Sequence, residues 1–433
     1  MVLLLAILLS LCMEASLFAQ GRGSAPAAPS GLMPASWWNK TTMRSGKASP
    51  SRYYAIRSDL PEADTREFAK RLDLMYVEYQ KRLAGLEARG PGQLNVFIFS
   101  RRQDYLDTLR TQFGVDATGS GGMFFISPRG AGLAFFVQGV PRTHVHHVIQ
   151  HEGFHQVAYT RFANDLPPWV NEGMAEFFGE AVVIGNEVVI GQSSARTLNA
   201  VKAAIEAGTT IPFLEMVTMT PEGWNGRVQS GSAALQYQQA WSMVHFLVYG
   251  EGGRYRGAFE QYLRHLNNGS TSVDAFMRAF GTTDLTSFEQ RWKAYAAAAQ
   301  PSAMLTAVER LRFLAEGMLS LAAESRRPKD FEELKAMLME KKFTLTIDHH
   351  GHSVTMSASD PGIFDIPDDE HSKEPPVFAL EPFKARGLSL KERKAEETNP
   401  TPPSIVTLGL RPRELAVQWG RVGETFEYEI GVK

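Results

Sequence analysis

The segment "IQHEGFHQV" (residues 149–157) places two histidines four residues apart, with a glutamate directly after the first. In an α-helix, residues i and i+4 lie on one face, one turn apart. His151 and His155 would therefore direct two imidazoles at one cation, and Glu152 would stand beside it. A carboxylate in that position can act as a general base on water at a metal. The segment predicts a helix with two metal ligands and a catalytic base.

The residues around this motif indicate how the helix begins and packs. Pro141 and Thr143 predict its start, with Thr143 as the N-cap residue. Apolar residues on both sides of the motif predict that much of the helix is buried. Gly153 lowers helix stability by about 1 kcal/mol relative to alanine. Its presence therefore predicts crowding at that position, by a neighbouring backbone or by a substrate.

The next segment, "NDLPPWVNEGMAEFFGE" (residues 164–180), offers a third ligand. Its two prolines predict a turn, and a second helix is expected to begin near Trp169. Glu172 and Glu176 would lie on one face of this otherwise apolar helix, where buried carboxylates need a partner or a metal. A catalytic zinc site has three protein ligands and one open position. The alternative is that both carboxylates lie on the solvated face of an amphipathic helix.

Together these segments resemble the gluzincin metallopeptidases, whose pattern is His-Glu-x-x-His followed by Asn-Glu on the next helix. The run "WVNEGMAEFF" is similar to the peptidase MA-like families and to aminopeptidase-N-like enzymes. The resemblance covers about residues 50 to 300 and implies a zincin-like fold of the α+β class with one Zn²⁺ per chain. It implies that His151, His155 and Glu172 are the metal ligands, with Glu152 as the general base.

The resemblance also implies roles for two further residues. Glu176 stands where thermolysin-like enzymes have a carboxylate that orients a ligand histidine. The 16 residues between His155 and Glu172 are slightly fewer than in the best-known members, so Glu176 stays open as the third ligand. The segment "LQYQQAWSMVHFL" resembles the tyrosine-bearing helix of aminopeptidase-N-like enzymes. Tyr237 would then stabilise the developing oxyanion; the alternative is a core aromatic side chain.

The remaining histidines are not expected to be metal ligands. The chain has 11 histidines, and the stretch from His144 to His155 is rich in them. His147 lies one helical turn before His151 and is expected to neighbour the metal or to be exposed, without being a ligand. His245 has apolar neighbours and is predicted to be a core histidine with satisfied hydrogen bonds. The run "DHHGH" (residues 348–352) is predicted to be a turn between strands.

These features predict a zinc-dependent metallopeptidase that hydrolyses peptide bonds in a peptide or protein substrate through water activated by Glu152. The strand "GLAFFVQ" (residues 132–138) is predicted to pair with an extended substrate. One alternative is a catalytically inactive zincin-like binding or scaffold protein of the cell envelope. Another is a metal hydrolase that acts on compounds other than peptides.

Composition adds limits on partners and location. A net charge of −2 gives no reason to expect a nucleic acid or an anionic membrane as partner. Residues 1–20 are predicted to be a signal peptide, with an uncleaved membrane anchor as the alternative, and residues 21–50 a flexible tether. Cys12 is the only cysteine, so the mature chain would have no disulfides. Once the signal peptide is removed, the mature chain is also expected to have no membrane span. We expect export to a bacterial periplasm or to the extracellular space.

The order of predicted elements divides the chain. Residues 51–140 are expected to be a small α/β part that ends in an exposed hairpin, and residues 141–300 a helical zinc-binding lobe. Residues 301–433 are expected to form a separate α+β appendage of unassigned role, with charged, proline-rich linkers such as residues 391–404.

Overall fold

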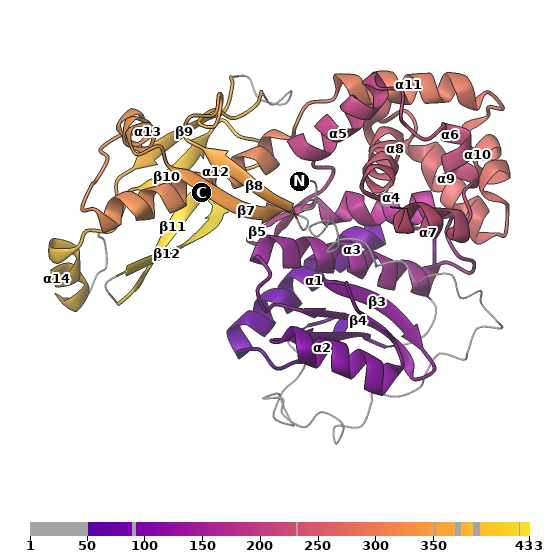
Figure 1. Cartoon of the computed structure of the whole chain (residues 1–433), viewed down its shortest axis with the longest axis horizontal. Coiled ribbons are helices and arrows are strands. Elements are labelled where there is room, and N and C mark those ends of the chain that lie inside the picture. The colour runs from indigo at the N-terminus through magenta and orange to yellow at the C-terminus, as the bar shows by residue number, and fades with distance from the viewer. Residues whose placement is uncertain are drawn as a thin grey trace, which may run out of the picture. The chain divides into compact units, whose positions relative to one another are not determined.

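The computed structural model describes residues 51–88, 92–230, 233–349, 352–368, 374–383, 390–423 and 425–433. The predicted signal peptide and tether lie outside these residues. The fold is of the α+β class, and the chain divides into two compact units (Figure 1). The first holds the described residues up to Ala181 together with Val188–Gly191 and Arg196–Ala299, and the second holds Val182–Glu187, Gln192–Ala195 and Gln300–Lys433.

A four-stranded sheet forms one end of the first unit (Figure 1). Its strands are β1 (Tyr54–Ser58), β2 (Leu94–Phe99), β3 (Gly122–Ser127) and β4 (Gly130–Phe136), in the order β1-β2-β4-β3. β1, β2 and β4 run parallel, and β3 returns antiparallel to β4. A hairpin was predicted at the end of this α/β part, and β3 and β4 form it. The expectation that it is exposed was wrong, because most residues of both strands are buried.

The prediction that the strand at residues 132–138 pairs with a substrate was wrong. Leu133 of β4 pairs with Val96 on one side and with Phe124 on the other, so β4 has no free edge for a peptide. β3, the other arm of the hairpin, is one of the two edge strands of this sheet, and β1 is the other. Both arms contain a run of consecutive apolar residues, at 123–126 and 133–136, because helices cover both faces of the sheet. The sequence pattern therefore could not distinguish the edge strand from the inner one.

Helices cover both faces of this sheet. α1 (Glu62–Arg82) and α3 (Arg142–Arg161) lie on one face, where Phe68 and Ile149 share a core with Ile98 and Phe135. α2 (Arg102–Thr108) and the π-helical turn η2 (Leu109–Phe113) lie on the other face. Successive strand residues point to opposite faces, which is why neighbouring residues of β2 contribute to different cores.

The start of α3 differs from the predicted one. The helix begins at Arg142, with Pro141 as the N-cap residue at φ −56° and ψ 139°. The carbonyl oxygen of Pro141 accepts the amide of Val145, which closes the first turn. Thr143 therefore lies inside that turn and is not the cap. An extended proline with a fixed φ can lead straight into a helix, and this took precedence over the capping preference of threonine.

The rest of the first unit is mostly helical, as predicted for residues 143 to 299. The helices are α4 (Pro168–Gly179), α5 (Ala195–Glu206), α6 (Phe213–Thr218), α7 (Pro221–Gln229), α8 (Ala233–Gly253), α9 (Arg256–Asn267), α10 (Ser272–Phe280) and α11 (Leu285–Ala298). Two short paired strands, β5 (Val182–Ile184) and β6 (Glu187–Val189), follow α4 in the sequence, and β5 belongs to the second unit. α4 packs against both α3 and α8. A Cβ atom at Gly173 would lie only 2.5 Å from the carbonyl oxygen of Ala240, so glycine permits the close approach of α4 and α8.

The second unit combines helices with an antiparallel sheet. Its elements are α12 (Ala303–Ala323), α13 (Phe331–Glu340), β7 (Thr344–His349), β8 (His352–Ser357), β9 (Val377–Glu381), α14 (Leu390–Thr398), β10 (Ser404–Leu408), β11 (Leu415–Val422) and β12 (Thr425–Val432). The larger sheet has the order β12-β11-β10-β9, and β7 pairs with β8. The predicted linker at residues 391–404 was partly wrong, because its lysines, glutamates and alanine favour the helix α14. In the described part of the chain, no helix is long and apolar enough to cross a membrane.

Replacing Gly173 by alanine tests the contact between α4 and α8. The added methyl group meets backbone, which cannot move aside cheaply, so Gly173→Ala is expected to lower the free energy of unfolding by about 1–3 kcal/mol. Urea denaturation of the metal-free protein measures this. The control is Gly257→Ala on α9, where a Cβ meets no described atom within 4 Å. A Gly173→Ala protein as stable as that control would contradict the close packing.

Candidate metal centre

The helices α3 and α4 bring His151, His155 and Glu172 together, as predicted. The Nε2 atoms of the two histidines lie 3.1 Å apart. Oε2 of Glu172 lies 3.4 Å from Nε2 of His151 and 3.4 Å from Nε2 of His155. All three side chains are buried. The three donor atoms thus form a nearly equilateral triangle that could hold a metal ion.

The distances between the three donor atoms indicate which kind of metal site they could form. Zinc binds nitrogen and oxygen donors at about 2.0–2.2 Å, in a tetrahedron whose corners are therefore about 3.3–3.5 Å apart. The observed spacings of 3.1–3.4 Å are close to that edge length. Three protein donors occupy three corners and leave one for water or substrate. The residues present therefore fit a catalytic metal site better than a closed structural one.

Glu176 reaches the opposite side of His151. Its Oε1 atom lies 3.1 Å from Nδ1 of His151, so it can hold the imidazole with Nε2 directed at the triangle. His147 continues this arrangement, with its Nε2 atom 3.6 Å from Oε2 of Glu176. His147, His151 and Glu176 form a second group of possible metal donors, which shares His151 with the first. Of the two, only the group with Glu172 is buried at every member.

Asn171 has a role that the sequence reasoning missed. Its Oδ1 atom lies 3.2 Å from Nδ1 of His155, so the second histidine is also held at Nδ1. Both imidazoles then present Nε2 to the same point, as is usual for metal-ligating histidines with a hydrogen-bonded second nitrogen. The signal was present in the sequence, since an asparagine next to Glu172 in an apolar helix needs a polar partner.

Glu152 lies beside the triangle and is held from outside the helix. Its Oε2 atom accepts a 2.8 Å hydrogen bond from the backbone amide of Phe124, on the edge strand β3. Burial raises the pKa of Glu152, and the nearby His151 and His155 oppose this shift. A carboxyl group with a raised pKa and a fixed orientation is suited to accept and return a proton near neutral pH.

The candidate metal ligands include a carboxylate and imidazoles, whose opposite charges compensate one another. Burial opposes ionisation of Glu172, but His155 and His151 outweigh it and lower the pKa of Glu172 to about 2. Burial alone would lower the pKa of His151, yet hydrogen bonds to Glu172 and Glu176 raise that pKa well above 6.5. In the absence of metal, a proton on His151 therefore balances the buried carboxylates.

The packing around α3 explains the glycine in the motif. Tyr79 of α1 donates a 2.6 Å hydrogen bond from its hydroxyl to the carbonyl oxygen of Gln150. A Cβ at Gly153 would lie 3.0 Å from that hydroxyl oxygen. Crowding at Gly153 was predicted, but the crowding group is the Tyr79 side chain and neither a backbone nor a substrate.

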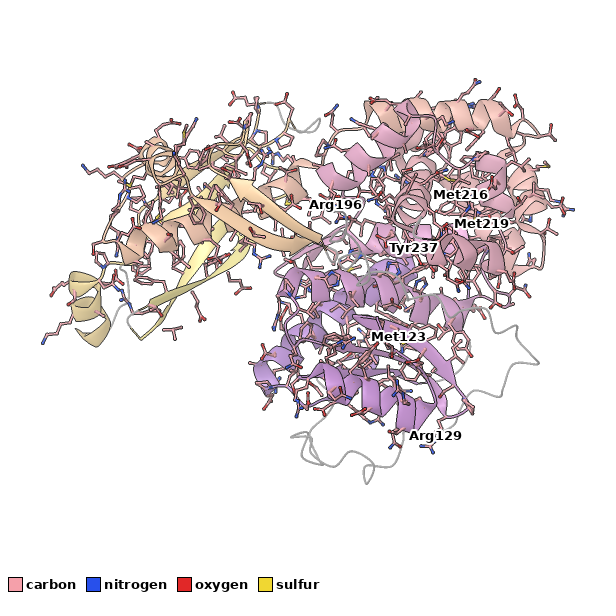
Figure 2. The ribbon with its side chains drawn as sticks, viewed as in Figure 1. Met123, Arg129, Arg196, Met216, Met219 and Tyr237 are labelled. Carbon is pink, nitrogen blue, oxygen red and sulfur yellow. The ribbon has the colours of Figure 1, made fainter. Side chains whose placement is uncertain are left out.

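Tyr237, the predicted oxyanion donor, is among the described residues. Tyr237 lies on α8 (Figure 2). Its half-buried ring contacts the edge of the Trp224 ring, and the two ring centroids lie 5.2 Å apart. Trp224 in turn lines a cavity beside His155 and Glu172, which places the tyrosine near the site without assigning it a role.

The prediction for His245 is confirmed. Its Nδ1 atom lies 2.8 Å from the hydroxyl of Tyr295, its Nε2 atom lies 3.1 Å from the carbonyl oxygen of Gly191, and burial lowers its pKa to about 4. The run at residues 348–352 joins β7 to β8 as predicted, and residues 350 and 351 lie outside the described part of the chain.

Comparison with known protein families gives one finding. A family model described as a protein of unknown function, DUF1570, matches residues 146–273. The match begins inside α3, includes all of α4 and α8, and extends to the start of α10. The candidate metal centre, Glu152 and Tyr237 therefore all lie within the matched region. A search of curated proteins finds no match.

Metal binding near neutral pH is expected to release a proton from His151. The raised pKa keeps this imidazole protonated above pH 6.5, and a metal ion must displace the proton to reach Nε2. Metal affinity should therefore rise with pH until the pKa of His151 is passed. Calorimetric titration with Zn²⁺ in buffers of different ionisation enthalpy measures the proton count.

The control for this titration is Glu176→Gln, which removes one of the three carboxylates that raise the pKa of His151. We expect it to release fewer protons at pH 7. Heats of binding that do not depend on the buffer would contradict the prediction.

Proposed function

We propose that this protein is a zinc-dependent metallopeptidase of the gluzincin type, related to the peptidase MA-like families. The observation that carries the proposal is the buried triangle of His151, His155 and Glu172, with the Glu152 carboxylate held beside it. The donor set of two imidazoles and one carboxylate suits zinc. A buried base next to an open metal position is the arrangement that hydrolysis requires.

The surrounding fold supports a zincin-like architecture. The helix α3, which carries two ligands and the base, lies across a mixed sheet whose edge strand, β3, passes beside the base. The third ligand comes from the next helix, α4. An edge strand next to the site can pair with an extended peptide through backbone hydrogen bonds, and so fix the scissile bond near the metal. Peptides are therefore the substrates that this arrangement favours.

The chain's own residues divide the chemistry among them. Zinc, when bound, supplies a Lewis acid that lowers the pKa of water and polarises a carbonyl group. Glu152, oriented by the Phe124 amide, accepts the proton of the attacking water and returns it to the leaving amine. Tyr237 is proposed to donate a hydrogen bond to the oxyanion as charge develops. Asn171 and Glu176 keep the two imidazoles in place during these steps.

Metal analysis tests the ligand set. The purified protein should contain about one zinc per chain, and His155→Ala and Glu172→Ala should each lose it, because two remaining ligands bind zinc weakly. His265→Ala on α9 is the control, since it removes a histidine outside the site. Wild-type protein that binds no zinc after reconstitution would rule out the proposed function and its inactive zincin-like alternative together.

Substitution of the base separates binding from catalysis. Glu152→Gln keeps the shape of the side chain and leaves all three metal ligands intact, so zinc content should stay at about one per chain. Hydrolysis of an unstructured protein should fall by a factor of about 10² to 10⁴, the usual contribution of a general base. Bound zinc in a wild-type protein that cleaves no peptide would instead favour an inactive zincin-like binding or scaffold protein.

The role of Tyr237 has its own test. If the hydroxyl stabilises the oxyanion, Tyr237→Phe should lower kcat by about 10²- to 10³-fold with little change in KM, because the interaction forms only in the transition state. The phenylalanine keeps the ring contact with Trp224, so the thermal stability should hardly change. An unchanged kcat would identify Tyr237 as a packing residue.

A further inference from the structure

A cavity of about 80 Å³ opens beside two of the candidate metal ligands, His155 and Glu172. The last turn of α3 contributes Ala158 and Tyr159 to its wall, and the C-cap residue Phe162 follows them. Its other lining includes residues from the turn after α3, from α4 and from α7. All of these elements belong to the first unit.

The wall of this cavity is mainly apolar. Phe124, Ala158, Phe162 and Trp224 are all at most 4 % exposed, and each of them lines the space. Asn164 and Asp165 also line it, and they are exposed, so the cavity reaches solvent on the side of the turn after α3. An apolar space that connects solvent to a polar metal centre is typical of a ligand-binding site.

Phe124 connects this cavity with the rest of the site. Its backbone amide holds Glu152, its ring lines the cavity, and it lies in the edge strand β3. A peptide that lies along β3 would therefore pass the general base and the cavity within one residue of each other. Side chains of an extended peptide alternate in direction, so one next to the scissile bond can enter the cavity.

We propose that this cavity is a specificity pocket for a branched aliphatic side chain on the substrate residue next to the scissile bond. The inference rests on the proposed peptidase function. The volume sets the size of the side chain: a cavity of about 150 Å³ can hold benzene. About half of that space favours a leucine-sized group over a larger aromatic one.

A series of zinc-binding probes tests the pocket without requiring turnover. Hydroxamic acids that carry a methyl, an isobutyl or a benzyl group are titrated into the zinc-loaded protein by calorimetry. The hydroxamate anchors each probe at the metal, and the substituent reports on the adjacent space. The isobutyl probe should bind on the order of tenfold more tightly than the methyl probe, and the benzyl probe should gain less.

A matched pair of variants locates the effect. Ala158→Leu should fill the cavity and remove the advantage of the isobutyl probe, while the zinc content stays unchanged. Ala203→Leu, at an exposed position of α5, should leave the advantage intact. If Ala158→Leu fails to fold, the wild-type probe series still decides, because equal affinities for all three probes would overturn the pocket.

Cleavage of a randomised peptide library separates this inference from the function on which it rests. Cleavage next to leucine, isoleucine or valine supports both. Cleavage with no aliphatic preference on either side of the scissile bond overturns the pocket and leaves the peptidase standing. Zinc binding with the expected probe series but no cleavage overturns the peptidase and leaves an apolar ligand pocket at the metal centre. Protein that cannot bind zinc overturns both.

Discussion

Burial of ionisable groups between α3 and α4 is the constraint on which the rest of the first unit depends. Glu152, Glu172 and two histidines lie together, and each is at most 6 % exposed. Isolated carboxylates in such surroundings would be strongly unfavourable, and only close, correctly oriented partners offset the cost. The spacing of 3.1–3.4 Å among the three donor atoms provides that compensation, by a proton on His151 or by a metal ion.

The donor atoms keep this spacing only if α3 and α4 hold fixed positions relative to each other. Contacts around the two helices hold them in place. Nε2 of Gln150, the residue before His151, donates to the carbonyl oxygens of Phe178, Gly179 and Ala181 at the end of α4. The side-chain oxygen of Gln150 accepts a hydrogen bond from Arg71 of α1, so one buried amide joins three segments. Gly173, directly after Glu172, lets α8 pack closely against α4.

Under the proposed function, the edge strand β3 would bring a substrate to this centre. β3 contributes a backbone amide to the base and an aromatic ring to the neighbouring cavity, and the outer side of the strand is not paired within the sheet. Binding, proton transfer and side-chain selection would therefore meet at a single strand. This arrangement also explains why the inner strand β4 could not serve, since both of its sides are already hydrogen-bonded.

Local features of the sequence determined much of this picture. The four-residue spacing of His151 and His155 follows from helix periodicity alone, and the buried charge of Glu172 pointed to a cation between two helices. An α/β arrangement of residues 51–140 with a hairpin at its end was also predicted, because strands and helices have distinct hydrophobic periods. Only the tertiary structure decided that β3 is the edge strand, that Asn171 holds His155, and that Tyr79 crowds Gly153. Each of these depends on contacts between segments far apart in the chain or on how two helices are turned toward each other, and no local pattern encodes that geometry.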